Sequence, residues 1–338
     1  MRAAIFNEQR QLEIQDRPMP EPEPGWVRIG ISAVGICGTD LHLMHGKFGA
    51  VAGLQPGHEV AGFVDKVGDD VGLTSGTLVA FEPLTSCGTC RHCLEHQYNR
   101  CASSRIFGVN RKGGMAEYLT VPANRLHPVH AAVQANVAAL AEPLAVCSRG
   151  IAMAALSSTS QVAILGAGTI GLLAIVAAQS AGAHSVSITA RHPHQQALAR
   201  ALGANVFDSS EAMLKALGDD TVDAVIETVG GDARTLTDAV TLVRRGGRIV
   251  MLGLFDGAPR IPGLAFSTKE LTLLGSNCYS HSGGHSDFGA GVVLMQANAQ
   301  RIEPLITHKF GLRDVNTAFA TAADKSSGSI KVQIEPQR

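Results

Sequence analysis

Four cysteines gather in one short stretch of the chain, at Cys87, Cys90, Cys93 and Cys101, whereas the whole sequence has only seven. Thiolates are ligands that zinc prefers, and a loop this short can place four sulfurs around one tetrahedral ion at about 2.3 Å each. Four thiolates complete the coordination shell and leave no position for a substrate. The spacing therefore predicts a structural zinc site, with the neighbouring His92 and His96 as exposed bystanders.

A disulfide framework is the alternative for such a cluster. Disulfides need an oxidising compartment, and the first residues, Met1–Phe6, are followed at once by polar ones, so the long apolar core of a signal peptide is missing. We therefore expect a cytoplasmic protein whose clustered cysteines bind metal.

A second set of metal-ligand types lies upstream of the cysteine cluster. Cys37 follows a strand-like run, and Gly57 leads into His58 and Glu59. A thiolate, an imidazole and a carboxylate together suit zinc. Taken one by one, Cys37 can equally be a small buried hydrophobe and His58 a satisfied core histidine. The spacing alone leaves both interpretations open.

Glu142 is a further acidic candidate. Residues 131–140 are rich in alanine and favour a helix, and Pro143 disfavours helical geometry at the residue before it. We expect Glu142 at the end of that helix, beside a turn, where an ordinary surface carboxylate is the alternative.

A glycine pattern stands between a strand and a helix near the middle of the chain. Val162–Leu165 is a short apolar run, and it leads into Gly166, Gly168 and Gly171 at the spacing Gly-x-Gly-x-x-Gly. The helix-favouring residues 172–181 follow. In such a turn the glycines allow a sharp bend, a close approach of a pyrophosphate, and tight packing of helix on strand. The pattern predicts a dinucleotide-binding site, for which a merely structural turn is the alternative.

Two kinds of structure must position these residues. Up to about residue 80, short strands with glycine and proline punctuation predict an irregular β domain, and Val27, Ile29 and Ile31 show the alternation of a half-buried strand. From about residue 160, strands alternate with helices, which predicts an open parallel sheet of the doubly wound type. The expected strands are 162–165, 185–189, 206–207, 222–227, 248–252 and 271–274.

The composition narrows the range of binding partners to be expected. The 338 residues carry a formal net charge of −1, so there is no basic field for nucleic acid. We find no apolar run long enough to span a bilayer. The expected partner is a small molecule, with no nucleic acid and no membrane.

The motifs together resemble the zinc-containing medium-chain dehydrogenase/reductases, in the branch of polyol (sorbitol-like) and threonine dehydrogenases. The resemblance covers nearly the whole length. It rests on residues 35–42, Gly57-His58-Glu59, the four-cysteine loop, Glu142-Pro143-Leu144 and the glycine turn. It implies a GroES-like catalytic domain, residues 1–146 and 285–338, and a Rossmann nucleotide-binding domain, residues 147–284. It also implies a homodimer or homotetramer.

The resemblance assigns roles around a catalytic zinc. It implies Cys37, His58 and Glu142 as ligands and Glu59 as a ligand or a water-bridged neighbour. Asp40 matches the residue that holds the zinc-bound histidine, while Thr39 and His42 match a proton relay. A zinc with an open position acts as a Lewis acid on the oxygen of an alcohol or carbonyl, and hydride passes to or from a nicotinamide.

The end of the second Rossmann strand selects the dinucleotide. An acidic residue there would bind the ribose 2′-hydroxyl of NAD(H), but this sequence has Ala190 followed by Arg191. Arginine pairs well with phosphate, so we expect NADP(H), with Thr189 or His192 as helpers. The predicted cofactor-binding residues are Gly166, Gly168, Thr169, Ile170, Gly171, Ala190, Arg191, Gly253, Gly275 and Ser276.

The resemblance implies a small alcohol or ketone as the substrate, with a polyol or hydroxylated ketone among the candidates. Sorbitol-type enzymes commonly have an arginine just before a pocket tyrosine, and this chain has Cys278 before Tyr279, which argues against a sugar polyol. A zinc-free quinone or enoyl reductase of the same superfamily is one alternative. A non-catalytic NADP(H)-binding protein is another.

Overall fold

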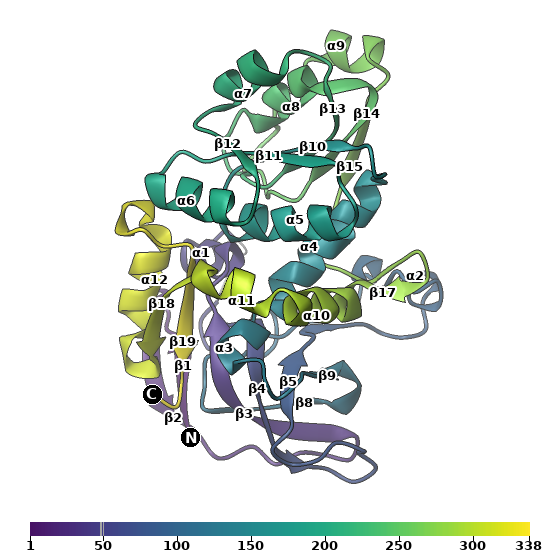
Figure 1. Cartoon of the computed structure of the whole chain (residues 1–338). Coiled ribbons are helices and arrows are strands. Elements are labelled where there is room, and N and C mark those ends of the chain that lie inside the picture. Colours follow the sequence, from purple (N-terminus) through teal and green to yellow (C-terminus); the bar gives the residue numbers. More distant parts are fainter. Residues whose placement is uncertain (48, 50) are drawn as a thin grey trace. The chain divides into compact units, whose positions relative to one another are not determined.

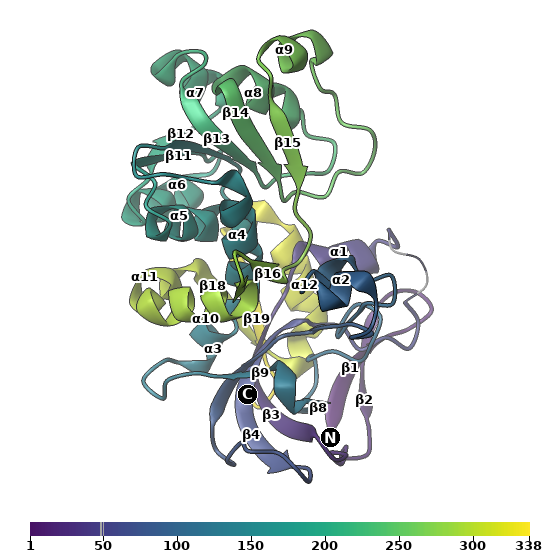
Figure 2. The ribbon, with the colours of Figure 1, turned by 90° about the vertical axis from the view of Figure 1, so that its right-hand side faces the viewer.

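The computed structural model describes residues 1–47, 49 and 51–338 and divides the chain into two compact units. Unit 1 comprises residues 1–142 and 295–338, and unit 2 comprises residues 143–294. The limits of the units lie inside helices α4 (Ala141–Ala154) and α10 (Asp287–Ala297), whereas the predicted domain boundaries are at 146/147 and 284/285. The elements are labelled in Figure 1, and Figure 2 shows them from the side.

Unit 1 is built on a mainly antiparallel sheet of seven strands in the order β18-β19-β3-β4-β5-β9, with β8 also paired to β3. Only the β18–β19 pair is parallel. Residues from the end of the chain thus join strands from its beginning. The strands and helices of this unit are β1 (Arg2–Phe6), β2 (Leu12–Asp16), β3 (Trp26–Gly35), α1 (Gly38–Met44), β4 (Glu59–Val67), β5 (Leu78–Phe81), β6 (Leu84–Thr85), α2 (Arg91–Leu94), β7 (Arg105–Ile106), β8 (Tyr118–Pro122), β9 (Leu126–Pro128), α3 (Ala135–Ala138), α11 (Ala299–Ile302), β18 (Ile306–Gly311), α12 (Val315–Ala323) and β19 (Lys331–Glu335).

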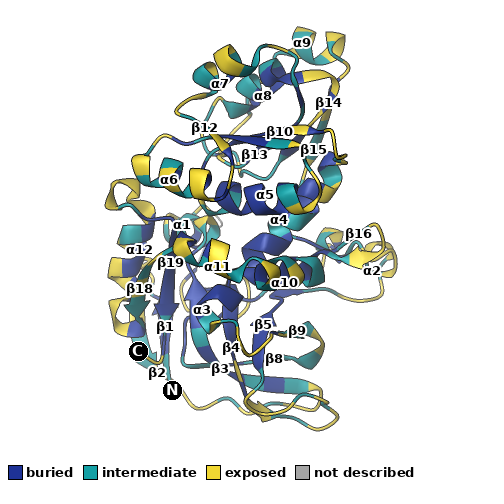
Figure 3. Ribbon diagram, in the orientation of Figure 1, coloured by how far each residue is buried: buried dark blue, intermediate teal, exposed yellow. Residues whose placement is uncertain are grey.

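The core of unit 1 follows the alternation expected for β3. Val27, Ile29 and Ile31 are fully buried, while the intervening residues are partly exposed. Their side chains pack with Phe81 and Phe319 in one hydrophobic cluster, which is the dark blue interior of Figure 3. The predicted irregular β domain is confirmed.

Unit 2 contains a six-stranded parallel sheet in the order β12-β11-β10-β13-β14-β15. The order reverses between β10 and β13, which is where doubly wound sheets bind ligands at the carboxyl ends of the strands. Helices α5 and α6 lie on one face, and α7 and α8 lie on the other (Figure 1). The elements are β10 (Gln161–Leu165), α5 (Thr169–Ser180), β11 (Ser185–Thr189), α6 (Pro193–Ala201), β12 (Asn205–Phe207), α7 (Ser210–Leu217), β13 (Val222–Glu227), α8 (Thr235–Leu242), β14 (Val243–Met251), α9 (Gly263–Thr268), β15 (Thr272–Gly275), β16 (His281–Ser282) and β17 (His285–Ser286).

All six predicted strands of this sheet are present, five of them within one residue at each end, whereas β14 begins at Val243, five residues before its predicted start at 248. The sequence pattern succeeded because strands that are buried on both faces read as continuous apolar runs. The predicted fold class, a GroES-like β domain with a Rossmann domain, is confirmed.

One local prediction was wrong. Glu142 does not end a helix but lies in the first turn of α4, because Pro143 needs no N–H partner at the start of a helix. Residues Ala135–Ala154 consequently form a 20-residue apolar helical stretch, long enough by length and composition to cross a membrane, contrary to the sequence prediction. Because 78% of the most apolar 18 residues in this stretch are buried inside the protein, it is a core helix.

Candidate metal centres and cofactor site

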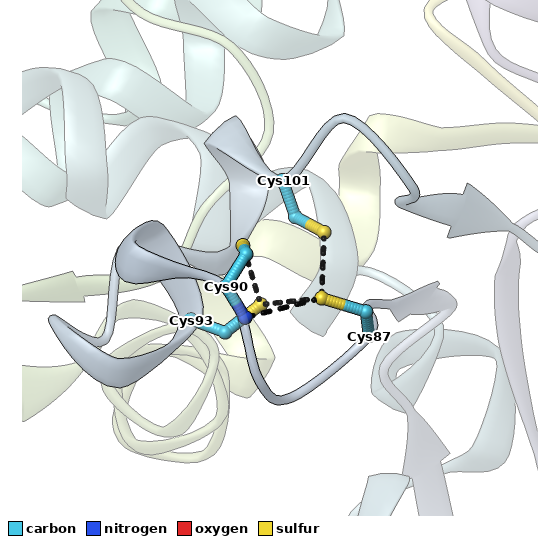
Figure 4. Close-up of side chains that lie close together, drawn as sticks. All are labelled: Cys87, Cys90, Cys93 and Cys101. Carbon is cyan, nitrogen blue, oxygen red and sulfur yellow. Dashed lines mark hydrogen bonds between the residues drawn. The ribbon is translucent and has the colours of Figure 1, made fainter.

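The four clustered cysteines come together as expected from their spacing. Cys87 precedes α2, Cys90 begins it, Cys93 lies within it, and Cys101 follows the next turn, so one short loop supplies all four sulfurs (Figure 4). Their sulfur atoms lie within 4.8 Å of one another, and all four thiols are free of disulfides. The neighbouring His92 and His96 are exposed.

The spacing of these sulfurs suits a tetrahedral ion. Cys87 Sγ lies 3.5 Å from Cys101 Sγ and 3.9 Å from Cys93 Sγ, and Cys90 Sγ lies 3.6 Å from Cys93 Sγ. A zinc ion with bonds of about 2.3 Å would place its sulfurs about 3.8 Å apart. The backbone N–H of Thr89, followed by that of Cys90, lowers the pKa of Cys87 to about 6. These four residues therefore fit a closed zinc site.

A buried acidic residue that the sequence reasoning missed connects this loop to the sheet. Glu82 accepts a hydrogen bond from the hydroxyl of Tyr98 at 2.7 Å and forms an ion pair with Arg125 at 2.8 Å. His127 Nε2 lies 3.2 Å from the other carboxylate oxygen of Glu82. Because Tyr98 lies between the third and fourth cysteines, these contacts hold the loop against β5 and β9.

The second predicted metal site also forms a compact group. Cys37 follows β3 at the start of α1, and His58 and Glu59 stand where β4 begins. The pairing of β3 with β4 places Gly35 opposite Glu59 and so brings the two segments together. Ligand atoms of Cys37, His58 and Glu59 lie within 4.8 Å of one another. His58 and Glu59 are buried, and Cys37 is partly buried.

Asp40, on α1, holds the backbone of this group in place through hydrogen bonds. It is fully buried, its Oδ2 accepts the N–H of Cys37 at 2.8 Å, and its Oδ1 accepts the N–H of Gly57 at 3.3 Å. Oδ1 also lies 3.7 Å from Nδ1 of His58. The carboxylate thus faces one ring nitrogen of the histidine and leaves the other for a metal, which is the usual arrangement around zinc-bound histidines.

Burial and neighbouring charges shift the pKa of His58 in opposite directions. Burial lowers the pKa of His58, but the negative charges of Asp40 and Cys37 raise it, and the net result lies well above the ordinary value. A bound cation would reverse this balance because it repels the proton of an imidazolium. The negative charges of Asp40 and Cys37 beside His58 would favour a bound cation, as expected of a metal site.

Two predicted ligands, Glu142 and Glu59, need a closer description. Glu142 is not a member of it among the described residues, although its carboxylate is buried and its charge raises the pKa of His58. Glu59 is a member, but both of its oxygens accept hydrogen bonds from Lys331. Sequence reasoning missed Lys331, whose only signal was a charged residue at the start of a short strand-like run.

Thr39 and His42 lie three residues apart on α1 and are both partly exposed. Residues at this spacing share one face of a helix. Thr39 Oγ1 is 3.8 Å from Cys37 Sγ, so its hydroxyl lies beside the candidate metal ligand. The arrangement suits a chain of hydroxyl and imidazole that leads away from the site.

Each glycine of the turn in unit 2 occupies its position for a different physical reason. Gly166 has φ +100°, and a Cβ there would lie 2.6 Å from Val229. A Cβ on Gly171 would collide with the backbone oxygen of Gly166, so the third glycine lets the helix pack against the turn. A Cβ on Gly168 would meet no described atom within 4 Å. That open space at the start of α5 is where a pyrophosphate can approach free N–H groups.

Thr169 and Ile170 form the first turn of α5, directly after this open space. Their backbone N–H groups are among the first four of the helix and so have no partner within it. Both residues thus lie at the positive end of the helix dipole, directly after the glycine turn, as the sequence pattern predicts.

The end of β11 carries the predicted selectivity residues. Arg191 is exposed, and the described residues supply it with no carboxylate. Ala190 before it is buried. The hydroxyl of Thr189 accepts the N–H of Gly166 at 2.9 Å, and its O–H still has a hydrogen to donate. Among the predicted contacts to a 2′-phosphate, Arg191 offers an exposed guanidinium with no carboxylate partner in the part of the chain that the structure describes.

Three further predicted cofactor residues lie at the carboxyl ends of β14 and β15. Gly253 must be glycine for an internal reason, since a Cβ would collide with the buried carboxylate of Glu227. Gly275 is open, with Met251 as its nearest neighbour at 3.9 Å. Ser276 donates its N–H to the backbone oxygen of Met251, while its buried hydroxyl has no hydrogen-bond partner among the described residues.

Comparison with known proteins identifies the families of the two halves. Residues 23–131 match the alcohol dehydrogenase GroES-like domain, and residues 169–298 match the zinc-binding dehydrogenase domain. The chain is 33% identical over 333 residues to L-threonine 3-dehydrogenase of Pyrococcus furiosus, covering 94% of each chain. It is 29% identical over 352 residues to sorbitol dehydrogenase of Bacillus subtilis, covering 100% of this chain and 98% of that protein.

A solved structure shows the same fold. It comes from Sinorhizobium meliloti 1021, is described as a candidate zinc-binding dehydrogenase bound to NADP, and superimposes with a TM-score of 0.91 at 30% identity. The match covers 99% of each chain. With the metal-ligand clusters and the glycine turn in place, these similarities show that the chain belongs to the zinc-containing medium-chain dehydrogenase/reductases, in the branch of polyol and threonine dehydrogenases.

Proposed function

We propose that this protein transfers a hydride between NADP(H) and a small alcohol or ketone, with one catalytic and one structural zinc per chain. The observation that carries the proposal is the group of Cys37, His58 and Glu59, whose ligand atoms lie within 4.8 Å of one another. A zinc-free reductase of the same superfamily lacks catalytic zinc ligands and would not require such a group. A zinc ion held there would act as a Lewis acid on the oxygen of the substrate.

The chain's own residues have distinct tasks in this proposal. Cys37, His58 and Glu142 would hold the metal, and Asp40 would fix the orientation of the His58 ring. Thr39 would accept the proton that leaves the substrate hydroxyl, which would then pass by way of the cofactor ribose to His42 and solvent, because imidazole exchanges protons readily near neutral pH.

The preference for NADP(H) rests on the end of β11. Arg191 is an exposed guanidinium without a carboxylate partner among the described residues, and it directly follows Ala190, which stands where an NAD(H) enzyme would have an acid. A related structure contains NADP. The test is to compare kcat/KM for NADPH and NADH, and a preference of the wild type for NADH would refute this part of the proposal.

The substrate class is tested with a panel of alcohols, polyols and ketones, assayed in both directions with purified protein. We expect turnover of a small hydroxylated compound and about two zinc ions per chain. Zinc only at the four-cysteine loop, with turnover of quinones or enoyl compounds, would favour the zinc-free reductase. No turnover in any assay would favour a non-catalytic NADP(H)-binding protein.

The oligomeric state is part of the proposal as well. The resemblance to the family implies a homodimer or homotetramer. Light scattering coupled to gel filtration measures the mass directly, and a monomer of about the chain mass of 35.3 kDa would contradict it.

A further inference from the structure

A buried carboxylate in the parallel sheet has no task in the proposed function. Glu227 is the last residue of β13 and is fully buried. Its Oε1 accepts the N–H of Val229 at 2.8 Å and the N–H of Gly230 at 3.0 Å. The same oxygen accepts the hydroxyl of Thr235, the first residue of α8, at 2.7 Å. One carboxylate oxygen therefore holds both ends of the loop that connects β13 to α8, residues 228–234.

This loop lies against the glycine turn. The hydroxyl of Thr228 donates to the backbone oxygen of Leu165 at 2.8 Å and to that of Gly166 at 3.1 Å. The side chain of Val229 takes up the space that a Cβ on Gly166 would need. These contacts join β13 to β10, where the strand order of the sheet reverses. The position of the turn that would bind the pyrophosphate therefore depends on the loop after β13.

Glu227 also contacts the loop after β14. Its backbone oxygen accepts the N–H groups of Leu252 at 2.8 Å and Gly253 at 3.1 Å. A Cβ on Gly253 would collide with Oε2, so the backbone of that residue packs directly on the carboxylate. The N–H of Gly231 joins the two loops further, because it donates to the backbone oxygen of Leu254 at 2.7 Å. Glu227 thus lies where the two loops meet.

The composition of residues 228–234 makes such an anchor necessary. Gly230 and Gly231 have φ values of +63° and +60° and can adopt many backbone conformations. Holding such a segment in one conformation costs entropy. If the segment is ordered in only a fraction of the molecules, the apparent Kd of a ligand that needs the ordered form rises by the inverse of that fraction.

We propose that Glu227 is a positioning residue for the dinucleotide, which orders the loops after β13 and β14 before the cofactor binds. This inference rests on the proposed function, because it requires that the carboxyl ends of these strands bind NADP(H). Glu227 acts through the backbone of the two loops and does not touch the reacting atoms.

The test compares the full-length wild type with Glu227→Gln, which keeps the size of the side chain but offers a neutral acceptor. Hydrogen bonds to a carboxylate are roughly twice as strong as those to a neutral group, so the loop should be ordered less often. In calorimetric titration we expect the Kd for NADPH to rise about tenfold. Without cofactor, amide hydrogen exchange in a peptide that covers residues 228–234 should become about tenfold faster or more.

Asp223→Asn is the matched control, because it makes the same change of acid to amide at the opposite end of β13. Asp223 accepts the N–H of Gln161 at 2.8 Å and pairs with Arg244 at 2.7 Å, away from both loops. This variant should melt at a lower temperature but bind NADPH within about twofold of the wild type, as expected of a distant site. If Glu227 were merely structural, Glu227→Gln would behave in the same way.

Thr235→Val provides a second variant in case Glu227→Gln does not fold, since it removes only one of the three donors to Oε1. We expect it to raise the Kd for NADPH about threefold and to speed exchange in the same peptide. NADPH affinity equal to the wild type in these variants, or weaker binding without faster exchange, would overturn the inference alone. A wild type that binds neither NADPH nor NADH would instead overturn the proposed function.

Discussion

Two glycines of the dinucleotide turn should respond differently to the same substitution: both changes should weaken cofactor binding, but only one should destabilise the fold. Gly168→Ala adds a methyl group to open space, because no described atom lies within 4 Å of that position and its φ of −76° suits any residue. Gly171→Ala adds the same group against the backbone oxygen of Gly166 and 3.1 Å from the hydroxyl of Thr228. The first change should damage cofactor binding, and the second should also damage the fold.

The magnitudes follow from these surroundings. For Gly168→Ala, the entropy gained by replacing glycine, about 0.4–1 kcal/mol, roughly offsets the weaker helix cap that alanine provides, so the free energy of unfolding should change by less than about 1 kcal/mol. Losing one hydrogen bond to a charged phosphate costs about 1.5–3 kcal/mol, which weakens NADPH binding on the order of 10- to 100-fold. For Gly171→Ala, forced movement of the backbone should cost about 1–3 kcal/mol or more.

Thermal unfolding and calorimetric titration with NADPH separate the two effects. Gly168→Ala should melt within about 4 °C of the wild type and bind NADPH far more weakly, whereas Gly171→Ala should lose both stability and binding. Gly72→Ala, which also adds a methyl group to open space but lies in unit 1, is the control and should change neither. NADPH binding by Gly168→Ala within about twofold of the wild type would refute the assignment of that space to the pyrophosphate.

Three further predictions concern other parts of the molecule. Arg191→Ala should lower kcat/KM for NADPH about 10- to 100-fold through loss of a charged contact with little change for NADH, and an equal fall for both cofactors would contradict the assignment. Cys101→Ser removes a buried ligand of the four-cysteine loop, so zinc content should fall by about one ion per chain, whereas Cys278→Ser should leave it unchanged. Although burial raises the pKa of Asp223, Arg244 and a backbone N–H lower it below its ordinary value. Its carboxylate therefore stabilises the fold above the unfolded value of about 3.9, and this contribution is lost as the pH falls through the folded-state pKa. The variant Asp223→Asn should accordingly be less stable by about 0.5–1 kcal/mol at pH 7. Urea unfolding at several pH values should show that difference vanishing in acid, and a constant difference would disprove the linkage.

The helix around Glu142 shows where sequence patterns mislead. Proline both ends helices and begins them, and the choice depends on what the flanking residues pack against. The sequence placed Glu142 at the end of one helix, but the structure places it in the first turn of the next. The apolar stretch Ala135–Ala154 was missed for the same reason, since the proline divided it into two shorter runs.

Thr189 and Gly253 show a similar limit within the Rossmann sheet. Gly253 was predicted from position alone to serve the cofactor, with Thr189 as a helper, and both residues also have structural roles that the motif does not reveal. The hydroxyl of Thr189 accepts the N–H of Gly166 in the turn after β10, and Gly253 makes room for the buried carboxylate of Glu227. Such roles depend on contacts between strands, and a position within one motif does not reveal them.

The sequence by itself determined the features that depend on neighbours along the chain. Four cysteines within one loop can meet around an ion whatever the rest of the fold does, and the glycine turn follows from the backbone freedom of three residues. Runs of apolar residues likewise revealed the six strands of the parallel sheet. These are short-range properties, because the residues that produce them are joined by a short length of chain.

Only the tertiary structure decided which distant residues share a site. Lys331 and Glu59 are separated by 272 positions, yet both oxygens of the carboxylate accept bonds from the one ammonium group. Nothing in either local pattern indicates this pair, because strand β19 reaches Glu59 only by adding to the edge of β3. A buried charge is tolerated only beside its partner, and which partner is available depends on the order of strands in the sheet.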